Sequence, residues 1–81
     1  MIRNMDDSCY GKLSVEKADE KFFRVNGDTH SIHFELKDIC IFATRGTMYE
    51  GIVSGVDLDE QIVYMDDIKI PVKKCEFFAR F

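Results

Sequence analysis

The chain has 81 residues, a size that fits one domain, and its formal net charge of −4 disfavours unspecific binding to nucleic acid. Its 46% hydrophobic content, with seven Phe and three Tyr, excludes a disordered chain. No apolar run approaches the ~20 residues of a membrane-spanning helix, so we predict no membrane partner. Three cysteines without a framework spacing, Cys9, Cys40 and Cys75, favour reduced thiols and a cytoplasmic location.

The first part of the chain contains the helix that we predict. Residues 1–13 are polar without a clear period, and we expect them to be flexible. Over residues 14–26 the apolar side chains recur at spacings of three, four and three, as on one face of a helix: Val15, Ala18, Phe22 and Val25. Ser14 can cap the start of this helix, and Asn26–Gly27 can end it. The pattern therefore predicts an amphipathic helix.

A hairpin is the alternative for the same region. The dipeptide Asn26–Gly27 lies between two runs rich in β-forming residues, 22–25 and 28–34, and such a dipeptide is a strong hairpin signal. We predict the helix over this hairpin, and the sequence leaves both open.

Residues 39–81 read as five short strands joined by tight turns, and an extended segment over Thr29–Leu36 precedes them. The strands are expected at Ile39–Thr44, Met48–Val56, Gln61–Met65, Ile68–Val72 and Cys75–Phe81. The second of them contains Gly51 and Gly55, and glycine within a strand usually marks a bend or a bulge. The fold class that we predict is mainly β: a small, strongly bent, five-stranded antiparallel barrel after an N-terminal helix.

Two motifs support this architecture. The pattern Tyr49-x-Gly51-x-Val53-x-x-Val56-Asp57-x-x-x-Gln61 resembles the first signature of the Sm and Sm-like RNA-binding proteins, which include bacterial Hfq. Gly51, Val53 and Asp57 match that signature. Gln61 stands where the family usually has asparagine, and Glu60 departs from a position that is usually apolar. The second motif is the corner Val72-Lys73-Lys74, where Lys73 occupies the cationic position of the family's second signature.

The resemblance implies an RNA site. In the family, an amide after the second strand reads a base edge, and a cation at the last corner stacks on or pairs with the nucleotide. The residues that would bind RNA here are Asp59, Gln61, Lys73 and Lys74, with Gly51 and Asp57 as structural residues of the motif. Asp59 replaces a side chain that is often aromatic or His, so it cannot stack on a base.

The resemblance also implies a ring. In the family the fifth strand of one subunit pairs with the fourth strand of the next subunit, which closes a cyclic homo-oligomer. The adjacent Phe77 and Phe78 place an aromatic ring on each face of the last strand, more than one small core needs. Pro71 argues against this pairing, because it removes one donor from the fourth strand. We predict a ring of five to seven subunits.

Two functions follow as expectations. The first is a ring subunit that binds single-stranded RNA on the face around its central opening. The alternative is an Sm-like or SH3-like barrel that serves protein assembly, for example in a viral or mobile-element context, without binding RNA. We predict no enzyme, since no phosphate loop or nucleophile–base signature is present. We also predict no cofactor or metal, because His30 and His33 would point to opposite faces of an extended segment.

Overall fold

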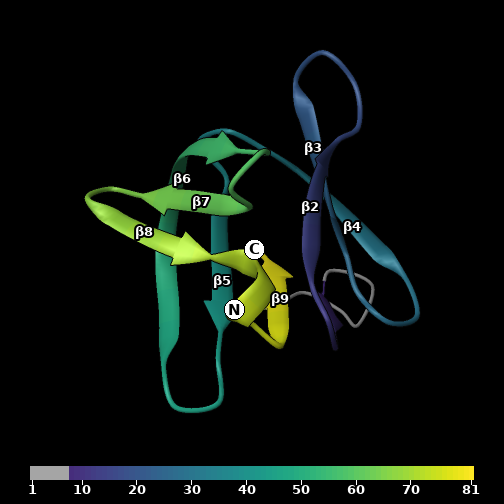
Figure 1. Cartoon of the computed structure of the whole chain (residues 1–81). Helices are drawn as coiled ribbons and strands as arrows, with labels where there is room; N and C mark the ends of the chain where they lie inside the picture. Colours follow the sequence, from purple (N-terminus) through teal and green to yellow (C-terminus); the bar gives the residue numbers. More distant parts are fainter. Residues whose placement is uncertain (1–7) are drawn as a thin grey trace.

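The computed structural model describes residues 8–81, which form two antiparallel β-sheets and one 3₁₀ helix (Figure 1). One sheet has six strands in the order β1-β9-β5-β6-β7-β8, and the other has three in the order β2-β3-β4. The elements are β1 (Ser8–Tyr10), β2 (Ser14–Lys17), β3 (Phe22–Asn26), β4 (Ser31–Glu35), β5 (Ile39–Ala43), β6 (Met48–Asp57), β7 (Ile62–Met65), β8 (Ile68–Pro71), η2 (Val72–Lys74) and β9 (Phe77–Arg80). Among the described residues, no helix is long and apolar enough to cross a membrane.

The five strands predicted from Ile39 onward are confirmed as β5 to β9. Each pairs with the next as far as β8, and β9 returns to pair with β5. Alternation of buried and exposed side chains explains this success. In β7, for example, Val63 and Met65 belong to the core, whereas Ile62 and Tyr64 on the other face are only partly buried.

The long strand β6 bends between its pairings with β5 and β7 (Figure 1). The register with β7 shifts between Val53 and Gly55, which marks a β-bulge at Ser54. A Cβ at Gly51 would lie 3.7 Å from Met65 Sδ, and one at Gly55 would lie 3.6 Å from Tyr64 Cδ2. Both distances are ordinary contacts, so the bulge rather than a missing Cβ accounts for the bend.

The predicted helix over residues 14–26 is wrong. This stretch forms β2 and β3, which pair with Val15 opposite Val25, and β3 then pairs with β4. The alternative hairpin around Asn26–Gly27 is therefore the correct interpretation. The sheet is favoured over the helix because of Phe23, which a helix would leave outside the apolar stripe. In the sheet, Phe23 stacks on Phe34 at 5.6 Å between ring centroids, on the face that also buries Val15 and Val25.

The expected closed barrel is also corrected, because β1 and β8 are the unjoined outer strands of the six-stranded sheet. The three-stranded sheet packs against its inner face instead, and the two sheets share one core. Phe78 of β9 joins them, with its ring 5.7 Å from Phe34 of β4 and 4.8 Å from Phe42 of β5. Since the N-terminal half supplies this second layer, the edges of the larger sheet need not meet.

Of the segment expected to be flexible, residues 1–13, residues 1–7 lie outside the described part, and the flexibility of residues 8–13 stays a prediction. Ser8–Tyr10 forms β1, which pairs with β9 along its outer edge. Cys9 and Leu13 are buried in the core. A short polar-looking sequence can thus form a strand when its apolar residues reach a core.

Candidate anion-binding site

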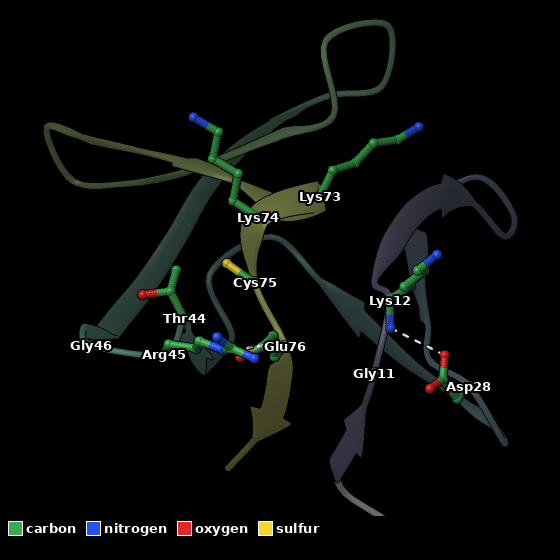
Figure 2. Close-up of a pocket in the computed structure, with 10 residues that line it drawn as sticks. All are labelled: Gly11, Lys12, Asp28, Thr44, Arg45, Gly46, Lys73, Lys74, Cys75 and Glu76. Carbon is green, nitrogen blue, oxygen red and sulfur yellow. Dashed lines mark hydrogen bonds and ion pairs between the residues drawn. The ribbon is translucent and has the colours of Figure 1, made fainter.

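A pocket of about 520 Å³ opens where four segments of the chain meet (Figure 2). The β1–β2 connection and the β3–β4 turn form one side, the β5–β6 turn forms another, and η2 with the residues after it forms the third. The lining residues are Gly11, Lys12, Asp28, Thr44, Arg45, Gly46, Lys73, Lys74, Cys75 and Glu76.

The lining of this pocket is basic, although the chain as a whole is acidic. Its charged side chains are four bases and two acids, which leave a net charge of +2: Lys12, Arg45, Lys73 and Lys74 against Asp28 and Glu76. The whole chain, by contrast, has a net charge of −4. All four basic side chains are exposed. A local positive potential on an acidic protein attracts anions to this place.

Lys12 is held at the pocket by a tight contact between two turns. Gly11 has a φ of +105°, and a Cβ at this position would lie 2.1 Å from Asp28 Cγ. Asp28 Oδ1 accepts a hydrogen bond from the backbone N–H of Lys12 at 3.1 Å, and the backbone N–H of Asp28 donates to Tyr10 O at 2.9 Å. Only glycine fits both this conformation and this space.

Glu76 connects the other two sides of the pocket. Its backbone N–H donates to Ala43 O at 2.8 Å, and its backbone oxygen accepts from Gly11 N at 2.9 Å. Its carboxylate lies 3.7 Å from Arg45 Nε, and the two side chains are 55% and 91% exposed. Such an exposed pair contributes little to stability, so Arg45 can turn to an incoming anion at small cost.

Cys75, the cysteine of the pocket, is not a reactive thiol. Burial raises the pKa of the Cys75 thiol to about 11, so it stays protonated near neutral pH. Its Sγ donates to Pro71 O at 3.5 Å. A protonated, buried thiol is neither a nucleophile nor a metal ligand. The described residues contain no group of three His, Cys, Asp or Glu that could hold a metal ion.

The structure separates the residues predicted to bind RNA. Lys73 and Lys74 both line the basic pocket, and their side chains extend from η2 in different directions (Figure 2). Asp59 lines a different pocket, of about 540 Å³, together with Asp57 and Tyr64. Within the motif, Asp57 Oδ1 accepts a hydrogen bond from the backbone N–H of Glu60 at 3.1 Å. Gly51 lies in β6 opposite Cys40 of β5.

The amide of Gln61 is engaged within the protein. Its Oε1 accepts the backbone N–H of Val15 at 2.8 Å, and its Nε2 donates to Val15 O at 2.8 Å and to Leu58 O at 2.9 Å. Gln61 therefore pairs with the edge of β2 as a strand would, and it ties the small sheet to the β6–β7 turn. An amide with these three bonds has little capacity left to read a base.

Sequence reasoning missed Lys12 and Arg45 as site residues. Lys12 lies in a stretch expected to be flexible, and Arg45 reads as an ordinary turn residue beside Gly46. They reach the lysine corner only because β1 and β5 both pair with β9, the strand that follows that corner. No residue spacing in the sequence predicts that Lys12 and Arg45 lie near the lysine corner.

The chain matches no protein-family model, no curated protein and no solved structure.

Proposed function

We propose that the chain is an Sm-like domain that binds single-stranded RNA through the phosphates at the basic pocket. The observation that supports this proposal is the gathering of Lys12, Arg45, Lys73 and Lys74 around one cavity of an otherwise acidic chain. The strands β5 to β9, with the lysine corner between the last two, agree with the order that the resemblance implies.

The chemistry of the pocket favours contacts to phosphate over contacts to bases. Lysine and arginine neutralise phosphate charge and release counterions, which makes binding tighter at low salt. The residues that line the pocket include no aromatic side chain on which a base could stack. Since the Gln61 amide is bonded to Val15 and Leu58, we expect binding with little preference for base sequence.

RNA binding is tested by fluorescence anisotropy with a labelled single-stranded oligoribonucleotide over a range of salt concentrations. Replacing Lys73 and Lys74 together by Ala should weaken binding and lower the slope of log K against log [salt] by about 1.4, at ~0.7 for each lost phosphate contact. The matched control removes two exposed lysines outside the pocket, Lys21 and Lys69, and should leave most of the affinity. If both double variants lose the same RNA affinity, the loss comes from the lower net charge of the chain and not from the pocket.

The ring remains a prediction. In this structure β9 is paired on both sides, with β5 and with β1, whereas β8 is paired only with β7. A ring in which β9 of one subunit pairs with β8 of the next would require β1 to leave the edge of β9. Light scattering at micromolar concentration distinguishes a five- to seven-subunit ring from a monomer.

The assembly module is the second candidate, and an apolar patch on the outer face of the large sheet favours it. Ile39 of β5 lies opposite Ile52 of β6, and Met48 lies further along the same face. These three side chains are 45%, 49% and 65% exposed. Such neighbouring apolar groups are typical of protein contacts. Replacing Ile52 by Lys should abolish any concentration-dependent association, and a wild type that stays monomeric would count against this candidate.

A further inference from the structure

The basic pocket is where cations gather in residues 8–81, because three of the six Lys and Arg outside it have partners within the chain and the other three lie apart from one another. Arg24 Nη2 lies 2.9 Å from Glu16 Oε1. Lys17 Nζ donates to Glu20 O at 2.9 Å. In β9, Arg80 Nη1 donates to His33 O at 2.7 Å. The three remaining lysines lie on separate elements outside the pocket: Lys21, Lys37 and Lys69.

An acidic turn adjoins the basic pocket on the side of η2. The backbone N–H of Val72, at the start of η2, donates to Gln61 O at 2.9 Å, which joins η2 to the end of the β6–β7 turn. That turn exposes Asp59 and Glu60. The next turn, between β7 and β8, exposes Asp66 and Asp67. A long polyanion that ran across η2 in this direction would meet repulsion rather than further cations.

The backbone donors of the pocket are mostly used within the protein. Four of these N–H groups donate to protein oxygens at 2.8 to 3.1 Å: those of Gly11, Lys12, Cys75 and Glu76. Since these N–H groups are already used, we expect the side-chain cations to supply most of the attraction to a ligand. Four cations against two acids favour a compact ligand with about two negative charges.

We propose that the pocket binds a phosphate monoester, so that an RNA is held by a terminal phosphate rather than along its length. This inference rests on the proposed function. A monoester carries a charge of about −1.5 to −2 at neutral pH and offers three acceptor oxygens. An internal phosphodiester carries a single charge. The cavity, about 520 Å³, falls in the size range of pockets for single small ligands.

The test compares one oligoribonucleotide in three forms: with a 5′-phosphate, with a 3′-phosphate and with hydroxyls at both ends. AMP and inorganic phosphate serve as competitors that carry the same monoester or phosphate group without an RNA chain. We expect a phosphate on one end to tighten binding about tenfold, which corresponds to about 1.4 kcal/mol. Lys12→Ala and Arg45→Ala should each remove most of this preference, whereas Lys69→Ala should keep it.

The outcomes separate the two proposals. Equal affinity for the three oligonucleotides would overturn the terminal-phosphate inference and leave RNA binding intact. Binding of AMP or phosphate, lost in Lys12→Ala, without binding of any oligonucleotide would refute the RNA function and support a free nucleotide as the ligand. Absence of binding to every probe would refute both. Unchanged thermal unfolding of the variants by circular dichroism shows that the fold is preserved.

Discussion

Replacing Gln61 by Glu tests the interpretation that this amide joins the two sheets. The substitution keeps the size of the side chain but removes both donor hydrogens. In the wild type, Gln61 Nε2 donates to Val15 O and Leu58 O, at 2.8 and 2.9 Å. A carboxylate oxygen in the same place would face two carbonyl oxygens without a hydrogen between them.

The magnitude follows from these contacts. Two hydrogen bonds contribute about 1 kcal/mol each, and leaving the partly buried Val15 carbonyl unpaired adds to the loss, so we expect about 2–3 kcal/mol of destabilisation. For a domain of this size each 1 kcal/mol lowers Tm by roughly 4–8 °C. The change should be apparent in urea unfolding and in thermal unfolding, both followed by circular dichroism.

The matched control is Glu60→Gln, which makes the reverse exchange at the neighbouring exposed position and should change stability by less than ~0.5 kcal/mol. If Gln61→Glu is as stable as the wild type, the account of a structural amide is refuted. If instead it abolishes RNA binding while the fold keeps its stability, Gln61 contacts the ligand.

Three further perturbations follow from the structure. Gly11→Ala should cost about 1–3 kcal/mol in urea unfolding because of its positive φ and the contact with Asp28, whereas Gly46→Ala, with nothing within 4 Å of the added Cβ, should cost little. Phe78→Ala should cost about 3–5 kcal/mol, since this ring is fully buried and joins the two sheets; loss of less than ~1 kcal/mol would contradict that role. Burial raises the pKa of the Cys75 thiol from 9.0 to about 11, so the unfolded chain loses this proton at lower pH than the folded chain. This thiol should therefore not change the free energy of unfolding below pH 9 and should lower it between pH 9 and 11. Cys75→Ala should reduce that decline, measured by urea unfolding at each pH.

The strands could be predicted from the sequence where alternation and turn residues agree. Over Ile39–Phe81 the β-rich runs are separated by clear turn residues, and β5 to β9 appear where those turns place them. In the N-terminal half the sequence wrongly predicts a helix, because Val15, Phe22 and Val25 also fit a helical stripe. The competing signal was Asn26–Gly27, and packing of Phe23 on Phe34 decides for the sheet.

The site could be predicted only in part, since it depends on contacts between distant segments. The lysine corner was visible as a local motif. Lys12 and Arg45 join it through strand pairings that no local pattern encodes. Gln61 was visible as a motif residue, but its role depends on Val15, 46 positions earlier, in a strand that the sequence did not reveal.

The most direct test of the central claim is an NMR titration of the ¹⁵N-labelled protein with a single-stranded oligoribonucleotide at low salt. The account predicts that the largest amide shifts appear at Lys12, Arg45, Lys73 and Lys74 and that added salt reverses them. Shifts centred on Asp59 to Gln61, or no shifts at all, would contradict it.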